Sequence, residues 1–381
     1  LWVFSNEIDI KATPLTGLEP GGLVRVVTDR DHFMGYAYAN PATLIAARIV
    51  SRSAAHPVGP ALFDERLRRA LALRERLFAH PSYRWVYGES DGLPGLVLDR
   101  FGDVVVGQIA TLGMQRLKGE IEAAVRRVLG PAVLFWKNDS GARTLESLPA
   151  ELELAWGEAP AALQVIESLA DGRALHYRAP FTGGQKTGWF FDQAVNRAAL
   201  ARYVAPGARV LDVCSYAGAW AVTAMAAGAA AATCVDSSQA ALDQALANGA
   251  ANGFPITARR GDAFDVLAAL AAEGERFDLV ILDPPAFIKR RKEFPQGVAA
   301  YRKLNQLALR LIDRDGVLVS CSCSWHLGSE DLLGAIQGAA RHVDRFVQLL
   351  QVGGQSPDHP VHPAIPETRY LKSFFCRVTR E

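Results

Sequence analysis

The feature that most constrains the fold is an alternation of short apolar segments with longer stretches rich in alanine and leucine, which fills the second half of the chain. Four apolar segments have the length and composition of buried strands: Arg209–Val213, Thr233–Asp236, Phe277–Leu282 and Gly316–Cys321. Helical stretches accompany them at Ala219–Ala227, Gln239–Asn248, Ala263–Ala272 and Tyr301–Leu311. Because strands that alternate with helices form βαβ units, this half is expected to be an α/β domain whose parallel sheet is covered on both faces.

The first half of the chain has a different pattern, in which short strand-like runs are separated by turn residues. Such runs lie between Leu23 and Ser51 and between Arg84 and Ile109, and further ones continue to about Tyr177. Amphipathic helices are expected at Ala61–Ala79 and Leu117–Leu129. The chain is therefore expected to contain a small β-rich domain (1–72), a central α+β domain (73–179) and a Rossmann-like α/β domain (180–381).

Composition and charge exclude several classes of protein. Of 381 residues, 50% are hydrophobic and 21% are charged, which suits large buried cores and argues against disorder. There are 41 Lys and Arg against 40 Asp and Glu, so a nucleic acid must be bound by a local basic patch rather than by an overall positive field. The odd number of cysteines, the lack of a signal-peptide pattern and the lack of an apolar run of roughly 18 residues predict a cytoplasmic protein that does not bind membranes.

Acidic residues follow the predicted strands of the α/β domain at four places: Asp212, Asp236, Asp262 and Asp283. Ligands of open α/β sheets bind beyond the carboxyl ends of the strands. Asp236 is placed to accept hydrogen bonds from a ribose diol and Asp262 from an adenine amine, whereas the turn from Asp212 to Gly218 lacks the glycine pattern of a pyrophosphate cradle. S-adenosylmethionine, which has ribose, adenine and amino-acid groups but no phosphate, fits this pattern. The alternative is that these acids merely cap helices.

The four acidic turns resemble those of class I S-adenosylmethionine-dependent methyltransferases, and five longer strings are more specific. They are Trp2-Val-Phe-Ser-Asn-Glu-Ile8, Glu89-Ser-Asp-Gly-Leu-Pro-Gly-Leu96, Gly184-Gln-Lys-Thr-Gly188, Phe191-Asp192-Gln193 and Tyr370-Leu-Lys372. Together they resemble the ribosomal RNA large-subunit methyltransferase I family, whose members make 5-methylcytosine in 23S rRNA. The resemblance runs nearly end to end. It implies an N-terminal PUA domain, a central RNA-recognition domain, a Rossmann-like catalytic domain and a homodimer.

The resemblance also implies that the segment from Gln185 to Gln193 lies along the cofactor. The residues expected to bind S-adenosylmethionine are Phe190, Asp192, Asp212, Ser215, Tyr216, Ala217, Gly218, Asp236, Ser237, Asp262, Ala263, Asp283 and Pro284. No metal site is expected, because the pair Cys321-x-Cys323 lacks the second spaced pair of a zinc site.

Methylation of a cytosine carbon needs help from a nucleophile. Cytosine C5 attacks a methyl sulfonium slowly, whereas a thiolate added to C6 turns the ring into an enamine whose C5 is reactive. The Ser-Cys-Ser element of the family matches Cys323 best, but Ser-Cys321-Ser is the same triplet two residues earlier, and the sequence leaves both open. Asp283 is expected to hold the N3/N4 edge of the cytosine. Cys323 and Asp283 are therefore the candidate catalytic residues.

A basic run follows the Asp-Pro-Pro turn as Phe287-Ile-Lys289-Arg290-Arg291-Lys292, with Phe294 and Tyr301-Arg-Lys303 close behind. Beside a methyl-transfer site, such a loop is expected to contact RNA phosphates and to stack a flipped base. Two other functions remain open: methylation of a purine base in rRNA, which needs no cysteine nucleophile, and a catalytically silent RNA-binding assembly protein. The sequence assigns no firm role to His359, which lies between Asp358 and Pro360.

Overall fold

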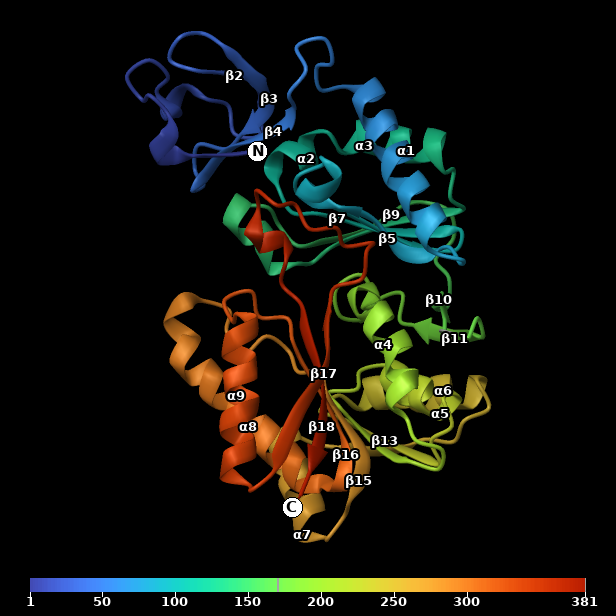
Figure 1. Ribbon diagram of the computed structural model, residues 1–381. Helices are drawn as coiled ribbons and strands as arrows, with labels where there is room; N and C mark the ends of the chain where they lie inside the picture. Colours follow the sequence, from blue (N-terminus) through green and yellow to red (C-terminus); the bar gives the residue numbers. More distant parts are fainter. Residues whose placement is uncertain (170, 381) are drawn as a thin grey trace. The chain divides into compact units, whose positions relative to one another are not determined.

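Figure 1 shows the computed structural model of the chain, which describes residues 1–169 and 171–380. The chain forms two compact units. Unit 1 comprises residues 1–164, 180–191 and 357–368, and unit 2 comprises residues 165–179, 192–356 and 369–381. Among the helices of the described residues, none is both long enough and apolar enough to cross a membrane.

Unit 1 begins with a four-stranded antiparallel sheet. Its strands are β1 (Trp2–Phe4), β2 (Leu23–Val27), β3 (Phe33–Ala39) and β4 (Ile45–Ser51), in the order β1-β4-β3-β2. Small and β-branched side chains of β3 and β4, among them Ala37, Ala47 and Ile49, form a core of their own. The short strands predicted for the small β-rich domain are thus confirmed.

A second sheet, of five strands in the order β5-β6-β7-β8-β9, forms most of the rest of unit 1. Its strands are β5 (Ser82–Tyr87), β6 (Leu96–Phe101), β7 (Val104–Ile109), β8 (Val133–Asn138) and β9 (Glu151–Trp156), and its helices are α1 (Pro60–Leu77), α2 (Leu112–Arg116) and α3 (Lys118–Val128). Phe63 and Leu67 of α1 are buried in the same core as Trp85 of β5, so α1 belongs with this sheet. The boundary expected at residue 72 therefore falls inside α1, and a boundary before Pro60 fits the packing better.

Two further strands, β10 (Leu163–Ser168) and β11 (Ala174–Ala179), pair with each other. The sequence pattern placed both in the central domain, yet most of their residues belong to unit 2. The side-chain amide of Asn248 explains this difference, because it accepts the backbone N–H of Arg178 at 2.8 Å and donates to the Arg178 carbonyl oxygen at 3.1 Å. This pairing ties β11 to α6 (Gln239–Ala251).

Unit 2 is built around a seven-stranded sheet in the order β14-β13-β12-β15-β16-β18-β17. Its parallel part consists of β12 (Arg209–Val213), β13 (Ala231–Asp236), β14 (Thr257–Arg260), β15 (Phe277–Leu282) and β16 (Ile312–Ser322). The antiparallel strands β17 (Phe346–Gly354) and β18 (Lys372–Thr379) complete it. The predicted Rossmann-like sheet is confirmed, but the expectation of a purely parallel sheet of four strands is corrected by β14 and the antiparallel pair.

Helices cover both faces of this sheet (Figure 1). The helices α7 (Ala263–Ala272), α8 (Phe294–Leu311) and α9 (Ser329–His342) share a core with Leu318, and α4 (Ala194–Leu200), α5 (Ala219–Ala226) and α6 share another with Val319. The chain runs outward from β12 to β14 and then returns to β15 on the other side of β12. At such a reversal, between β12 and β15, parallel α/β sheets bind their ligands.

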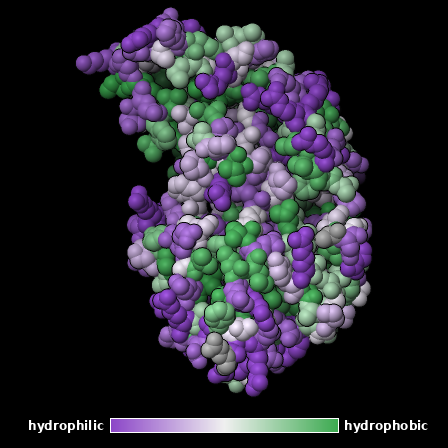
Figure 2. Space-filling model, in the orientation of Figure 1, coloured by the Kyte–Doolittle hydropathy of each residue, from purple (hydrophilic) through white to green (hydrophobic). Residues whose placement is uncertain are grey.

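The strand β17 forms one edge of the unit 2 sheet. Four of its apolar side chains are exposed: Phe346, Leu349, Leu350 and Val352. Figure 2 shows hydrophobic residues gathered over the part of the surface where β17 lies in Figure 1. An exposed apolar edge strand is a surface on which another strand can pair.

Candidate active site

The four predicted acidic residues lie at the carboxyl edge of the parallel sheet in unit 2. Asp212 is close to the end of β12, Asp236 ends β13, and Asp283 follows β15 directly. Asp262 follows β14 and precedes α7. Since β14, β13, β12 and β15 are neighbours in this order, the four carboxyl groups come from four adjacent strands.

The turn after β12 is tight and is fastened to the turn after β13. Tyr216 has a positive φ angle of 48° and Gly218 one of 73°. A side chain at 218 would place its Cβ 2.8 Å from the Cβ of Ala245, so glycine is required there. The Asp236 carboxylate accepts the backbone N–H of Tyr216 at 3.0 Å and that of Ser238 at 2.9 Å. Asp236 therefore joins the two turns.

Asp212 is completely buried in β12, and Ser215 in the following turn is buried as well. One oxygen of Asp212 accepts the backbone N–H of Ala221, in the first turn of α5, at 3.1 Å. Its other oxygen, Oδ1, has no hydrogen-bond partner within residues 1–169 and 171–380. Burial, reinforced by the nearby charge of Asp283, raises the pKa of Asp212 to about 8. A buried oxygen without a hydrogen-bond partner, at the place where the strand order of the sheet reverses, is suited to bind a polar ligand.

The other predicted cofactor residues of the turns have simpler surroundings. Asp262 accepts the backbone N–H of Phe264 at 2.8 Å and is the N-cap of α7, which Ala263 begins. In the protein by itself, Asp262 therefore caps a helix, which is the alternative role that the sequence left open. Ser237 is exposed, and Ala217 is buried.

Phe190 and Asp192 fall on either side of the division between the units. Phe190 belongs to unit 1, where the ammonium of Lys186 lies 4.6 Å from the centre of its ring. Asp192 belongs to unit 2, is buried, and accepts a hydrogen bond from the hydroxyl of Tyr370. Asp192 therefore lies in the same unit as the acidic turns, whereas Phe190 does not.

Asp283 is held by two side chains that the sequence did not assign to it. Gln193 Nε2 donates to Oδ1 at 2.9 Å, and Trp220 Nε1 donates to Oδ2 at 3.1 Å. Gln193 is itself fixed by Asn196, whose amide donates to Gln193 Oε1 at 2.7 Å. Burial raises the pKa of Asp283 above the usual range of an aspartate, although both hydrogen bonds oppose the shift. The carboxyl group therefore has a fixed orientation and keeps its proton to a higher pH.

The two candidate cysteines have different surroundings. Cys321 is completely buried within β16, and its thiol donates to the hydroxyl of Ser373 at 3.2 Å. Burial raises the pKa of the Cys321 thiol well above its usual range, which disfavours the reactive thiolate. Cys323 lies just past the end of β16, is partly exposed, and has its sulfur 4.0 Å from the carbonyl oxygen of Pro284, the residue after Asp283. Accessibility therefore favours Cys323.

Tyr301 anchors the residues on both sides of Cys323. The sequence pattern places Tyr301 with the basic residues expected to contact RNA, and this prediction is wrong, because α8 turns Tyr301 into the core, where 1% of it is exposed. Its phenol oxygen lies 2.9 Å from the hydroxyl oxygens of both Ser322 and Ser324, which are also buried. Cys323 is thus the more exposed residue between two anchored serines.

The basic run after the Asp-Pro-Pro turn forms the loop and the short 3₁₀ turn before α8. Lys289, Arg291 and Lys292 of this loop are exposed. The backbone N–H of Ile288 donates to the hydroxyl of Ser324 at 3.2 Å, which fastens the loop to the cysteine element. Exposed cations therefore lie next to the segment that carries the candidate nucleophile.

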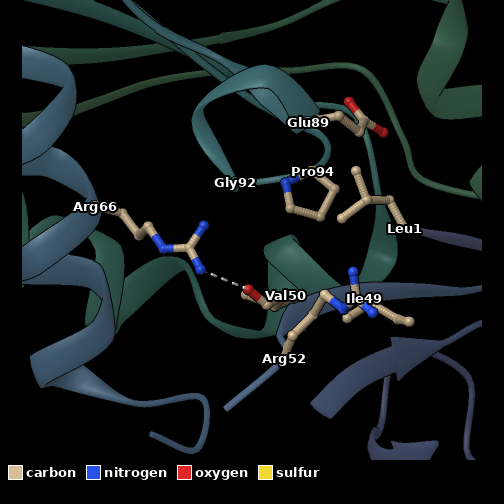
Figure 3. A pocket seen from close by; sticks show the side chains of 8 residues that line it. All are labelled: Leu1, Ile49, Val50, Arg52, Arg66, Glu89, Gly92 and Pro94. Atoms are coloured by element: carbon tan, nitrogen blue, oxygen red, sulfur yellow. Dashed lines mark hydrogen bonds between the residues drawn. The ribbon is translucent and has the colours of Figure 1, made fainter. Parts of the chain in front are cut away.

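Unit 1 has a cavity of about 210 Å³ lined by residues of β4, α1 and the turn after β5 (Figure 3). Arg52 and Arg66 are among them, and Arg66 donates to the carbonyl oxygen of Val50 at 3.2 Å. Gly92 has a φ angle of 73°, and a Cβ there would fall 1.6 Å from a guanidinium nitrogen of Arg66. Glycine at position 92 therefore lets this guanidinium reach the cavity.

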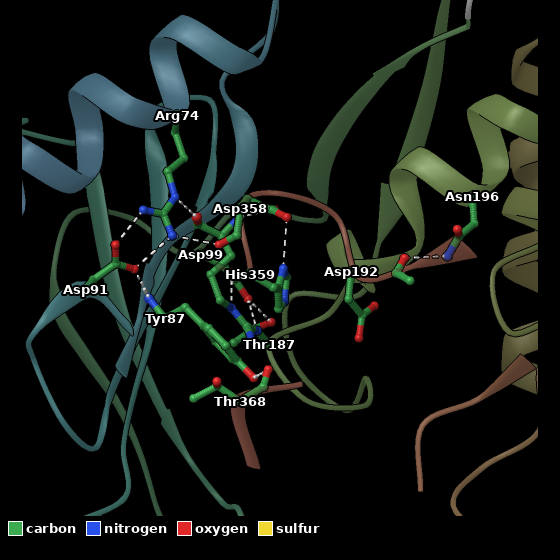
Figure 4. A network of polar contacts seen from close by, with 12 residues as sticks. Arg74, Tyr87, Asp91, Asp99, Thr187, Asp192, Asn196, Asp358, His359 and Thr368 are labelled. Carbon is green, nitrogen blue, oxygen red and sulfur yellow. Dashed lines mark hydrogen bonds and ion pairs between the residues drawn. The ribbon is translucent and has the colours of Figure 1, made fainter. Parts of the chain in front are cut away.

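Unit 1 also contains a network of buried polar side chains (Figure 4). Asp99 accepts two hydrogen bonds from the Arg84 guanidinium, each at 2.9 Å, and one from the hydroxyl of Thr187. Asp358 accepts the backbone N–H of Arg84 at 2.8 Å and lies 2.9 Å from Nδ1 of His359. The network holds segments that are distant in sequence on the central sheet. His359, to which no role is assigned from the sequence, is buried in this network.

The fold and the edge residues together define a class of enzyme, the class I S-adenosylmethionine-dependent methyltransferases. Residues 153–371 match the model of an S-adenosylmethionine-dependent methyltransferase family, and residues 1–52 match that of a PUA-like domain. The residues of the edge fit the cofactor. The buried Oδ1 of Asp212 and the carboxylate of Asp236 would accept hydrogen bonds from its amine and hydroxyl groups, and the described turn after β12 lacks the glycine pattern of a pyrophosphate cradle. These two residues and the turn between Asp212 and Gly218 would hold it.

Full-length relatives identify the family more narrowly. Over 99% of its length the chain is 34% identical to ribosomal RNA large subunit methyltransferase I of Salmonella arizonae, of which it covers 93%. It is 33% identical to the protein of the same name from Erwinia tasmaniensis, with 99% of this chain and 95% of that protein covered. The chain belongs to the ribosomal RNA large subunit methyltransferase I family.

Solved structures show the same fold. A methyltransferase crystallised with S-adenosylhomocysteine is 22% identical to this chain and has a TM-score of 0.82. The superposition covers 99% of this chain and 95% of that one. An S-adenosylmethionine-dependent methyltransferase from Streptococcus mutans gives the same identity and coverage, with a TM-score of 0.81.

Proposed function

We propose that the protein transfers a methyl group from S-adenosylmethionine to C5 of a cytosine in 23S ribosomal RNA, with Cys323 as the covalent nucleophile. The observation that carries the proposal is the partly exposed thiol of Cys323 beside the Asp283-Pro284 turn. Relatives named ribosomal RNA large subunit methyltransferase I support an rRNA substrate. Purine methylation would need neither this thiol nor the two anchored serines beside it.

In the proposed reaction, Cys323 loses its proton and its sulfur forms a bond to C6 of the cytosine. This addition moves the electrons of the C5–C6 double bond toward C5, which then forms a bond to the methyl carbon. S-adenosylmethionine supplies that methyl group on a positively charged sulfur, which keeps the bonding electrons and leaves as S-adenosylhomocysteine. A base then removes the C5 proton, the C5–C6 double bond re-forms, and the Cys323 thiolate leaves.

Asp283 is proposed to hold the N3/N4 edge of the cytosine during these steps. Because burial raises the pKa of Asp283, its carboxyl group has a proton available at a pH where a free aspartate has lost it. A proton donated toward N3 draws electrons out of the ring and makes C6 more electrophilic. Gln193 and Trp220 support this role because they fix both carboxyl oxygens.

The rRNA is proposed to contact two basic surfaces. One is the exposed loop before α8, which is fastened to the cysteine element through Ser324. The other is the cavity of unit 1 that Arg52 of the PUA-like domain and Arg66 of α1 line. Guanidinium groups bind phosphates well because their planar N–H groups match two phosphate oxygens.

The protein is also proposed to be a homodimer, with the exposed apolar side chains of β17 in the interface. Light scattering after size-exclusion chromatography should then give twice the 41.2 kDa mass of the chain. The double variant Leu350→Lys, Val352→Lys places two charges on this edge and should give the mass of one chain. An unmutated protein with the mass of one chain would contradict the proposal.

The proposed activity is tested by incubating the protein with S-adenosylmethionine and undermethylated 23S rRNA, followed by digestion and mass spectrometry of the nucleosides. We expect new 5-methylcytidine. Cys323→Ala should abolish it while S-adenosylmethionine binding is kept, and Cys321→Ala is the matched control that should still form it. A methylated purine would overturn the proposal, and cofactor binding without any product would favour the catalytically silent alternative.

A further inference from the structure

A lysine reaches the candidate site from the antiparallel part of the sheet. The strand β18 runs opposite to β16, so its first residue, Lys372, pairs with Ser322 at the carboxyl end of β16. Only 8% of Lys372 is exposed. The topology therefore brings a buried cation to the strand end beside which Cys323 lies.

The ammonium of Lys372 is bound by uncharged groups. Its Nζ donates to the carbonyl oxygen of Ser324 at 2.5 Å and to that of Tyr370 at 2.8 Å. Within residues 1–169 and 171–380, Lys372 forms no ion pair with a carboxylate. An ammonium has three N–H donors, so one remains for a further acceptor. A buried charge is unfavourable without a counter-ion. The ammonium of Lys372 is hydrogen-bonded to the carbonyl oxygen of Ser324, the residue directly after Cys323.

Several titratable and charged groups act on Lys372. Burial lowers its pKa to about 8, the charge of Cys323 opposes this shift, Arg369 adds to it, and Asp331 opposes it weakly. The phenol of Tyr301, which anchors both serines beside Cys323, has a pKa raised by burial and remains neutral. The thiol of Cys323 is therefore the group that can ionise and provide a negative charge to balance that of Lys372.

We propose that Lys372 is the counter-ion of the Cys323 thiolate. When the S–H bond of Cys323 breaks, its proton passes to water and the sulfur keeps the bonding electrons; the ammonium that Lys372 already carries stabilises this thiolate, and the pair then has no net charge. Lys372 is a positioning residue, because it acts on the RNA through Cys323. The inference rests on the proposed function and deepens it by naming the group that stabilises the ionised nucleophile.

The test measures thiol reactivity without RNA. Iodoacetamide is uncharged and reacts with the thiolate, and peptide mass spectrometry reports how much Cys323 is alkylated at each pH. Loss of an opposite charge at close range shifts a pKa by about 1–3 units, so Lys372→Met should slow the alkylation of Cys323 at pH 7 by about tenfold or more. Lys372→Arg keeps the charge and should keep most of the reactivity. Lys303→Met, which removes an exposed lysine of α8 in the same unit, is the matched control and should leave the profile unchanged.

Unchanged alkylation of Cys323 in Lys372→Met would overturn the inference. So would an unmutated protein whose Cys323 is alkylated with a midpoint at or above about pH 8.5, the value for a free cysteine. This second measurement needs no variant, so it decides the matter even if Lys372→Met fails to fold. Failure of the proposed function gives a different result, namely 5-methylcytidine formation that survives Cys323→Ala, whatever the alkylation profile.

Discussion

Replacing Tyr301 by Phe removes one oxygen atom from the interior of unit 2 and keeps the ring. That oxygen lies 2.9 Å from the buried hydroxyl oxygens of Ser322 and Ser324. Each hydrogen bond contributes about 0.5–1.5 kcal/mol net, so the free energy of unfolding should fall by about 1–3 kcal/mol. The ring still packs against Phe287, whose centroid is 4.7 Å away, so no cavity is created.

Urea denaturation measures this loss, and Tyr203→Phe is a suitable control. The hydroxyl of Tyr203 donates to Gln351 at 2.9 Å in a partly buried position away from the cysteine element, so this variant loses one such hydrogen bond. Because the two serines anchor Cys323, Tyr301→Phe should also slow methyl transfer, and Tyr203→Phe should not. A Tyr301→Phe protein with an unchanged free energy of unfolding and a weaker affinity for RNA would refute this reasoning. It would indicate instead that Tyr301 contacts the RNA.

Three further predictions concern the cofactor edge and the RNA. Asp236→Ala removes a carboxylate that joins two turns, so S-adenosylmethionine affinity measured by calorimetry should fall about tenfold or more; an unchanged affinity would exclude Asp236 from the cofactor site. The pKa of Asp212 is raised to about 8, so its favourable contribution to stability is present only while it is protonated and is lost as the pH rises from about 4 to about 8. Asp212→Asn should therefore melt at a higher temperature than the unmutated protein at pH 8 and at a similar temperature at pH 4, and equal differences at both pH values would argue against this. Arg291→Ala combined with Lys292→Ala should reduce the slope of log affinity for rRNA against log salt by about 1–2 in filter binding, and an unchanged slope would remove the loop from the RNA interface.

The strands of unit 2 differ in how far the sequence predicted them. β12, β13, β15 and β16 are short apolar segments between helices, and this local pattern is enough to find them. β14 was not predicted because its sequence, Thr-Ala-Arg-Arg, is polar and mostly exposed at the edge of the sheet. The antiparallel direction of β18 depends on which strand lies beside it, and periodicity along one segment does not encode that.

The acidic residues of the site were predictable because their position at the end of a strand is a local property. The partners of Asp283 were not, since Gln193 and Trp220 lie 90 and 63 positions away and reach it through the topology. A tryptophan in the first turn of the helix after Gly218 is the local signal that could have indicated such a contact. Tyr301 was misjudged because its basic neighbours Arg302 and Lys303 suggested an exposed position, whereas α8 buries one face and exposes the other.

The bond between Cys323 and the target base is the central claim, and trapping that bond tests it most directly. After methyl transfer to a cytosine that carries fluorine at C5, no proton is left at C5 to remove, so the thiolate cannot leave and the adduct accumulates. With fluorinated 23S rRNA and S-adenosylmethionine, we expect a protein–RNA complex that survives a denaturing gel and yields, after digestion, a modified peptide containing Cys323. Cys321→Ala should form the complex and Cys323→Ala should not. Attachment at Cys321, or no complex from a protein that methylates unmodified rRNA, would contradict the account.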